Sequence, residues 1–446
     1  MSVAISHGAS AAEPMSQAAA TDLPRRHLSD VVRARRAASL IVGQLPRGTP
    51  EPSEAEFRHI GEGLWLGDAA ADRLVNWMHR RGMREAWPLV QQAIELGVGG
   101  LPGLAPDADA ELRAFFDAVE ARPAWVRDEL LEEGARVCGL GGRAGMRALA
   151  VTGLMAGYQL AAVNQALLAT GALEKGAARR IAETTKWWID VTEPGAMTRF
   201  GEGFKGTLRV RIIHAMVRRQ LSQRPSWDAA DLGLPVNQTD MQATYLGFSI
   251  VYLLGLKLVG VPLRGDEKEA VLHLWRYIAW VNGVREDHLH AQDVTEAGAE
   301  GGAEQAAMRL LHANLLTQRM ADADSARLAR ALADEPLHRH YARWPVLTGR
   351  FNRAMQLSIA RACMGNDTLR GLGLPVWRLP WYPLAMMAFH QPLHRLMRAL
   401  PGGRERLMAW GRRRQRAYLP ILFGEQAPAL RELATVKAGA ASSTAS

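Results

Sequence analysis

One histidine near the middle of the chain is placed where it could bind a metal ion. Residues 207–221 read TLRVRIIHAMVRRQL. On a helix, three- and four-residue spacing puts His214 on an apolar stripe with Ile213 and Val217. A histidine in such a stripe is either a hydrogen-bonded core residue or a neutral imidazole that binds a metal.

Two arginines lie one helical turn from this histidine, one on each side. Arg211 precedes His214 by three residues and Arg218 follows it by four. Two guanidinium groups depress the pKa of a buried imidazole, so the ring is poorly placed to act as a cationic acid. A metal-bound neutral imidazole, with the arginines facing the carboxylates of a cofactor, fits better. Haem supplies both an iron ion and two propionates.

The helices predicted on either side of this segment carry further polar side chains. Over 177–191, before Pro194, the spacing aligns four of them on one face: Arg180, Glu183, Thr184 and Trp187. A third helix should begin near Gln238, because Asn237 with Asp240 three residues later is typical of a helix N-cap. Hydroxyl and aromatic side chains lie along it: Thr244, Tyr245, Phe248 and Tyr252.

The elements that must position these residues are helices. Ala, Leu and Arg dominate the 446 residues, apolar residues recur at helical spacing, and alternating Val/Ile/Thr segments are nearly absent. The 48% apolar content can fill one large core or two ordinary ones. We predict an all-α, single large helical domain. Gly- and Pro-rich breakers divide it into a flexible N-terminus (1–28), an N-terminal helical part (29–139), a core (140–365), a basic, aromatic segment (366–435) and a disordered tail (436–446).

The order of these motifs resembles one known family. RVRIIHAMVRR at 209–219 is similar to the latex clearing proteins (rubber oxygenases) and the fungal prenyl-chain oxygenases of mycophenolic acid synthesis, which are α-helical b-type haem proteins. GLPVNQTD at 233–240 and HLWRYIAWVNGV at 273–284 support the resemblance. The similarity covers residues 140–290 well and the flanks weakly.

The resemblance implies a globin-like helical core that encloses one non-covalent haem b. His214 would be the proximal axial ligand, and four further residues would contact the cofactor: Arg211, Arg218, Thr244 and Phe248. Rubber-cleaving members carry Arg-x-x-Lys-Thr on the preceding helix, facing the distal side of the haem. The matching residues are candidates for catalysis: Arg180, Glu183 and Thr184.

The chain departs from the rubber-cleaving pattern at Glu183, which replaces the lysine. This carboxylate is either a base or a structural partner of Arg180. Rubber-cleaving members also carry an upstream glutamate, where this chain offers Asn164 and Gln165. The first residues show no signal peptide, so we expect a cytoplasmic protein. Together these differences argue against polyisoprene itself as the substrate.

The basic charge of the chain is concentrated near its C-terminus. The formal net charge is +9, and residues 371–446 hold 11 Lys and Arg against 3 Asp and Glu. Aromatic residues and arginines alternate over 376–416, which is typical of a segment that lies on an anionic membrane surface. A C-terminal helix packed on the core with a solvated arginine face is the alternative. Nucleic acid ranks below both, because no recognised binding module accompanies the charge.

The expected function is therefore a haem b-dependent oxygenase acting with dioxygen on a hydrophobic, unsaturated, isoprenoid-like substrate. Oxidative cleavage of a carbon–carbon double bond is the reaction that the resemblance implies. The alternative is a non-catalytic haem protein, either a gas or redox sensor or a carrier. Two uncharged stretches could be mistaken for membrane spans: 148–173 is long enough to cross a bilayer and 241–256 is shorter. We interpret both as buried helices.

Overall fold

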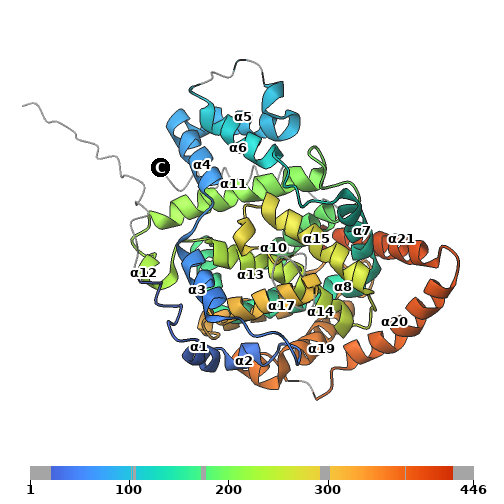
Figure 1. Ribbon diagram of the computed structural model, residues 1–446. Helices are drawn as coiled ribbons and strands as arrows, with labels where there is room; N and C mark the ends of the chain where they lie inside the picture. Colours follow the sequence, from blue (N-terminus) through green and yellow to red (C-terminus); the bar gives the residue numbers. More distant parts are fainter. Residues whose placement is uncertain are drawn as a thin grey trace, which may run out of the picture.

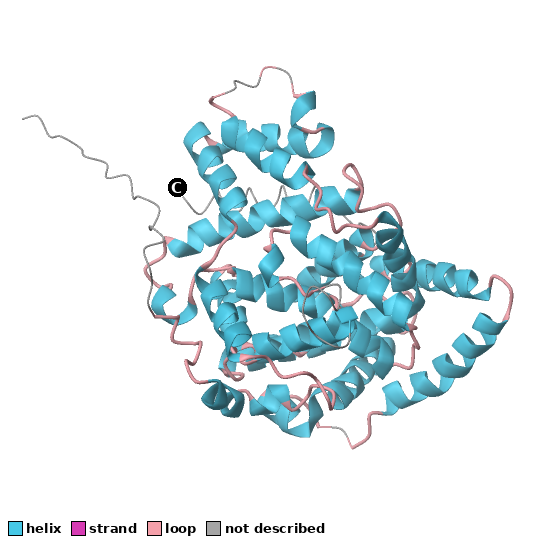
Figure 2. Cartoon of the chain, in the orientation of Figure 1, coloured by secondary structure: helices cyan, strands magenta, loops and turns pink. Residues whose placement is uncertain are grey.

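Helices are the only regular elements in the part of the chain that the structure describes (Figure 2). This computed structural model describes residues 22–424 apart from 102, 104–106, 172–176, 292–301 and 377. The all-α prediction is confirmed. The predicted tail and most of the predicted flexible N-terminus lie outside the described residues, and the division into parts stays a prediction.

A small lobe of three helices caps one end of the molecule and rests on the long helix α11 (Glu202–Ser222) (Figure 1). Its helices bury apolar faces against one another, with Leu74, Phe115 and Phe116 almost fully enclosed. Three earlier helices run along the central body. The bounds of these six helices are α1 (Val31–Ala37), α2 (Ser39–Val42), α3 (Glu54–Glu62), α4 (Ala69–Arg81), α5 (Met83–Leu96) and α6 (Ala110–Glu120).

The central body holds the helices that carry the predicted site. Their core is aromatic, and Trp188, Trp275 and Tyr252 are among the largest fully buried side chains. Helix α11 lies next to α10 and α15, so the candidate residues occupy neighbouring elements (Figure 1). The other helices here are α7 (Asp128–Cys138), α8 (Gly142–Leu149), α9 (Ala161–Ala169), α10 (Ala177–Val191), α12 (Ala229–Leu232), α13 (Gln238–Phe248), α14 (Ile250–Leu258) and α15 (Gly265–Val281).

The boundaries of the site helices follow the sequence signals closely. Helix α10 spans the predicted residues, and α13 begins at Gln238, where the Asn237 side chain accepts a hydrogen bond from the Asp240 amide at 2.9 Å. Helix α11 begins five residues before the predicted start, at Glu202. The long third helix is interrupted at Ser249, whose φ of −100° and ψ of −92° separate α13 from α14.

Two apolar segments could cross a membrane by length and composition alone. One is Gln238–Leu258, and 61% of its most apolar 18-residue stretch is buried inside the protein. The other is a pair, Asp128–Gln159 and Ala161–Ala169, bent by 96°. The uncharged stretch 148–173 is therefore no single straight helix, because a π-helical turn at Ala150–Met155 and the bend interrupt it.

The C-terminal helices line another edge of the molecule, where α20 and α21 follow each other (Figure 1). They share the main apolar core with the rest of the chain, since Leu407 and Leu422 pack in the same cluster as Ile41 and Leu74. The bounds are α17 (Gly302–Leu315), α18 (Ala323–Asp334), α19 (Pro345–Gly371), α20 (Trp381–Ala399), α21 (Gly403–Arg416) and α22 (Leu419–Phe423).

Candidate active site

Helix α11 directs its two predicted arginines at helix α4. Arg211 donates from Nε and Nη2 to the carboxylate of Asp68, at 2.6 and 3.0 Å. Arg218 donates to Asp72 at 2.9 Å and to the Val236 carbonyl at 2.6 Å. Burial alone would raise the pKa of Asp68, but the Arg211 and Arg218 guanidinium groups and the Ala71 amide together hold that pKa below the usual value.

These contacts correct the prediction that Arg211 and Arg218 face the carboxylates of a cofactor. The carboxylates they meet belong to the protein, and both arginine side chains are buried. A buried arginine without a counter-charge strongly destabilises a protein core. The two aspartates at the start of α4 supply the counter-charges for Arg211 and Arg218.

His214 lies on another face of α11, and that face keeps accessible surface. Ile213 and Val217 share it and are half-buried like the histidine, whereas Ile212 and Ala215 are fully buried. The Nδ1 atom of the imidazole is itself buried. A flat apolar ligand beside the imidazole requires an accessible apolar surface of this kind.

Arg180 on α10 is half-buried, and one of its donors is unused. Its Nη1 atom is buried and meets no hydrogen-bond partner among the described residues. Desolvation lowers the pKa of the guanidinium, while the nearby Tyr158 hydroxyl and Glu183 carboxylate favour its charged form. An arginine remains charged at neutral pH even so. The group is suited to stabilise negative charge on a ligand.

Glu183 is buried on the same helix, but its hydrogen bond differs from the predicted one. Its carboxylate accepts from Nε of Arg179, one turn earlier, at 3.1 Å. Arg179 is therefore a structural partner of this carboxylate, and the Arg180 guanidinium interacts with it through its charge. Lys186, on the same helix, forms an ion pair with Asp190 at 2.6 Å.

An aromatic cluster joins this face of α10 to α13 and α15. The Trp187 ring centroid lies 5.4 Å from that of Phe248 and 5.8 Å from that of Trp275. Phe248 also stacks on Trp275, at 5.3 Å and 13°. Because Arg180, Thr184 and Trp187 share one face of α10, the contact directs that face toward α13.

Thr244 and Phe248 lie one turn apart on α13 and have different surroundings. Phe248 is buried among protein aromatics, so its packing alone explains its position. The Thr244 side chain is accessible, and its hydroxyl donates to the Asp240 carbonyl at 2.9 Å. The structure thus brings Trp187 and Phe248 into contact, with Arg180 and Thr184 on the same face of α10 as Trp187.

Sequence reasoning missed Tyr158 as a neighbour of Arg180. Burial raises the pKa of this hydroxyl, although the Arg180 guanidinium opposes the rise. Tyr158 lies in a 3-10 turn, Gly157–Gln159, and no local pattern indicates its distant partner. Sequence reasoning also missed Asp68 and Asp72, the partners of Arg211 and Arg218. Their only signal in the sequence is weak, namely that they lie four residues apart, one helical turn.

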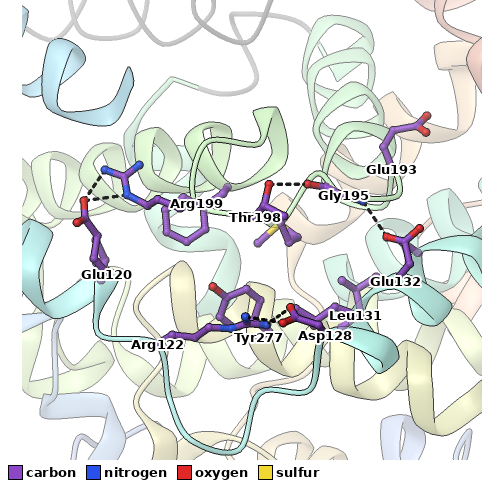
Figure 3. Close-up of a pocket in the computed structure, with 15 residues that line it drawn as sticks. Glu120, Arg122, Asp128, Leu131, Glu132, Glu193, Gly195, Thr198, Arg199 and Tyr277 are labelled. Carbon is purple, nitrogen blue, oxygen red and sulfur yellow. Dashed lines mark hydrogen bonds and ion pairs between the residues drawn. The ribbon is translucent and has the colours of Figure 1, made fainter. Parts of the chain in front are cut away.

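A cavity of about 640 Å³ lies elsewhere, between α6, α7, α11 and α15, and contains none of the predicted residues. Both of its arginines pair with carboxylates of the same lining (Figure 3). Arg199 donates to Glu120 at 2.6 Å, and Arg122 donates to Asp128 at 3.0 Å. Such self-paired charges leave little with which to bind a charged ligand, so we do not place the active site there.

Residues 130–401 match the family described as "ER-bound oxygenase mpaB/B'/Rubber oxygenase, catalytic domain". The chain belongs to this family. The match confirms the family resemblance, and it contains the helices that carry Arg180 and His214.

Two similar proteins support the family membership. The rubber oxygenase of Streptomyces sp. (strain K30) is 28% identical over 260 residues, which are 55% of this chain and 60% of that protein. The match therefore spans less than two thirds of the relative's length. The solved structure of latex clearing protein in the closed state superposes with a TM-score of 0.54 at 20% identity, over 82% of this chain and 93% of that one. This likeness shows the family's fold.

Proposed function

We propose that the chain is a haem b-dependent oxygenase acting on a hydrophobic, unsaturated, isoprenoid-like substrate. The observation that carries the proposal is the half-accessible apolar stripe of α11 around His214, within the residues that match the family. The name of the Streptomyces relative, a rubber oxygenase, supports a hydrocarbon substrate.

The residues around His214 fit haem b at the iron and at the apolar ring. The imidazole offers a nitrogen ligand, Ile213 and Val217 offer accessible apolar surface, and Arg180 offers a buried, unused donor. The two arginines predicted for the propionates are occupied by aspartates, so the propionates would need other partners. When bound, the haem would supply the iron centre at which dioxygen reacts.

The side chains of α10 would act on the oxygen and the proton. The Arg180 guanidinium would stabilise negative charge that develops on oxygen, and the Thr184 hydroxyl on the same face would orient it by a hydrogen bond. Glu183 would hold or pass a proton at its carboxylate. Cleavage of one carbon–carbon double bond with one dioxygen molecule gives two carbonyl groups, so the atoms balance without a further oxygen donor.

A non-catalytic haem sensor or carrier is the competing function. It would also need His214, but it would consume no dioxygen in the presence of an alkene. The dependence on Arg180 separates the two functions, because only turnover requires stabilisation of charge on the reacting oxygen.

Dioxygen uptake by the haem-loaded full chain tests the proposal. With an unsaturated isoprenoid we expect substrate-dependent uptake and carbonyl products that carry both atoms of labelled dioxygen. Haem binding without uptake on any of a series of unsaturated lipids would favour the sensor or carrier. Incorporation of a single labelled atom would indicate monooxygenation and overturn the cleavage reaction.

We also propose that the chain docks on an anionic membrane, through a surface formed by α20 and the start of α19. Large apolar side chains are exposed there: Trp344, Val346, Leu347, Phe351, Leu379, Leu384, Phe389 and Leu396. The ring centroids of Phe351 on α19 and Trp381 on α20 lie 5.8 Å apart, so the two helices form one continuous surface there. Exposed arginines surround it: Arg343, Arg350, Arg378 and Arg395. This combination suits an interfacial site.

The docking surface differs from the segment that the charge pattern suggested. Several arginines between 398 and 416 point into the protein, where Arg398 and Arg404 bind Glu267 and Arg412 donates to the Thr192 hydroxyl. By contrast, the side chain of Trp344 is 77% exposed, and its φ of 42° places it in the left-handed region that bulky residues avoid. An exposed tryptophan on a strained backbone supports a binding role.

Charge substitution on this surface should weaken membrane binding. The double variant Trp344→Asp/Leu347→Asp loses two anchors, each worth about 1.5–3 kcal/mol when buried in the interface, so vesicle binding should fall at least about tenfold. Cosedimentation with phosphatidylcholine/phosphatidylserine vesicles at low and high salt measures it. Leu96→Asp, at an exposed leucine on α5, is the matched control. Equal pelleting of the double variant and the wild type would contradict the assignment.

A further inference from the structure

Two histidines and an aspartate form a compact cluster outside the site described above. His59 lies in the last turn of α3, and Asp287 and His288 lie in the 3-10 turn Glu286–His288 after α15. Each offers one ligand atom, and the three atoms lie within 4.8 Å of one another. The two imidazole rings stack with centroids 4.4 Å apart.

His288 is fully buried, yet neither of its ring nitrogens is used. Its exposed fraction is 0%, and Nδ1 and Nε2 meet no hydrogen-bond partner among the residues that the structure describes. A buried polar side chain that leaves both nitrogens unpaired is costly, so its presence calls for a partner that the described part of the chain does not supply.

The ring of His288 is held in place by its surroundings. A Cβ at Gly63 would lie 2.4 Å from Cε1 of His288, so only a glycine fits there. The backbone carbonyl of His288 accepts from Nε2 of Gln242 at 2.9 Å, and its amide donates to the Arg285 carbonyl at 3.0 Å. The ring is therefore preorganised and loses little freedom on binding an ion.

The other two residues lie nearer the surface, so an ion could reach them. His59 Nε2 lies 3.0 Å from the Asp287 carbonyl oxygen and 3.9 Å from Oδ2 of the same residue. The Asp287 carboxylate accepts from Nε and Nη2 of Arg285, at 3.0 and 2.9 Å. Arg285 therefore already binds the carboxylate that a metal ion at this cluster would also need as a ligand.

We propose that His59, Asp287 and His288 bind a divalent transition ion of the Zn²⁺ class. Two imidazoles and one carboxylate are a ligand set that this class prefers over Mg²⁺ or Ca²⁺. Bonds of about 2.0–2.1 Å at tetrahedral angles separate ligand atoms by about 3.4 Å. His59 Nε2 and Asp287 Oδ2 lie 3.9 Å apart and all three ligand atoms lie within 4.8 Å of one another, so binding would draw the side chains together by up to about 1.4 Å. Water completes the fourth position, and the ion ties α3 to the turn after α15.

Metal titration of the full chain tests this site. After removal of metal by a chelator, Zn²⁺ affinity is measured by competition with a chromogenic chelator, and Co²⁺ geometry is read from its visible absorption. We expect one tight ion with a tetrahedral Co²⁺ spectrum. His59→Gln and His288→Gln should each weaken Zn²⁺ binding at least about tenfold. His79→Gln, at an exposed histidine on α4, and His214→Ala should leave it unchanged.

Arg285→Gln gives a result that a merely structural cluster would not show. Removal of the guanidinium frees the Asp287 carboxylate, so Zn²⁺ should bind several-fold more tightly, whereas Asp287→Asn should weaken binding. Absence of tight Zn²⁺ binding by the wild type, or an unchanged affinity in the soluble His59→Gln variant, would overturn the proposal. So would an octahedral Co²⁺ spectrum. The test does not depend on haem, so its failure is distinguishable from failure of the proposed oxygenase.

Discussion

Replacing Asp68 with alanine is expected to lower the free energy of unfolding by about 3–5 kcal/mol, because it strands the buried Arg211 guanidinium. The carboxylate accepts two hydrogen bonds from Arg211 and one from the Ala71 amide at the start of α4, at 3.3 Å. The alanine variant therefore loses an ion pair and a helix cap together. Chemical denaturation at fixed cofactor content measures the change.

Three further variants separate these contributions. Asp68→Asn keeps an oxygen for the cap and removes the charge, so the difference from alanine reports the cap, about 1 kcal/mol. The double variant Asp68→Leu/Arg211→Met should recover most of the loss, since apolar replacement of a buried ion pair is often neutral. Asp367→Ala breaks the exposed pair with Arg370 and should cost less than about 1 kcal/mol. A loss in Asp68→Ala no larger than that in Asp367→Ala would contradict the assignment.

The pH dependence of this contribution follows from the lowered pKa of Asp68. A carboxyl whose folded-state pKa lies below its unfolded value of 3.8 stabilises the fold fully at higher pH. The contribution is lost as the pH falls through the folded-state pKa. The wild type and Asp68→Asn should therefore differ most at neutral pH and converge only in strong acid.

Arg180→Met should reduce turnover by about 100-fold while haem content stays unchanged. Methionine preserves most of the volume of the side chain but removes the buried donor and its charge. The loss should appear in kcat rather than in KM, because the guanidinium acts on charge that develops during the reaction. Steady-state dioxygen uptake with an unsaturated isoprenoid gives both constants.

Arg219→Met is the matched control for this variant. Arg219 is half-buried on α11 and donates to Asn76, away from the face of His214. We expect nearly wild-type turnover from it. If Arg180→Met also kept wild-type kcat, the role assigned to the guanidinium would be wrong.

Local sequence signals predicted the elements of the site well. The apolar spacing of 177–191 corresponds to α10, and the Asn237 cap marks the first residue of α13. Both depend on interactions within a few residues, which a sequence displays directly. The motif around His214 also indicated the family, which the match over residues 130–401 confirms.

Partners that are distant in sequence could not be predicted in the same way. The spacing of Arg211 and Arg218 placed them beside His214, but it could not reveal Asp68 and Asp72 on a helix far upstream. The charge pattern of the basic C-terminal segment overstated the number of arginines available to a membrane for the same reason. Arg398 and Arg404 form ion pairs with the buried Glu267. Tertiary contacts decide which charges are free, and composition does not contain them.

The haem content of the wild type and of His214→Ala tests the central claim most directly. Both proteins are mixed with limiting haem, separated from excess, and assayed as the ferrous pyridine complex, with His79→Ala as a control at an exposed histidine. We expect about one haem per wild-type chain and at least tenfold lower occupancy in His214→Ala. Equal haem content with an unchanged absorption spectrum in that variant, or no haem in the wild type, would contradict the account.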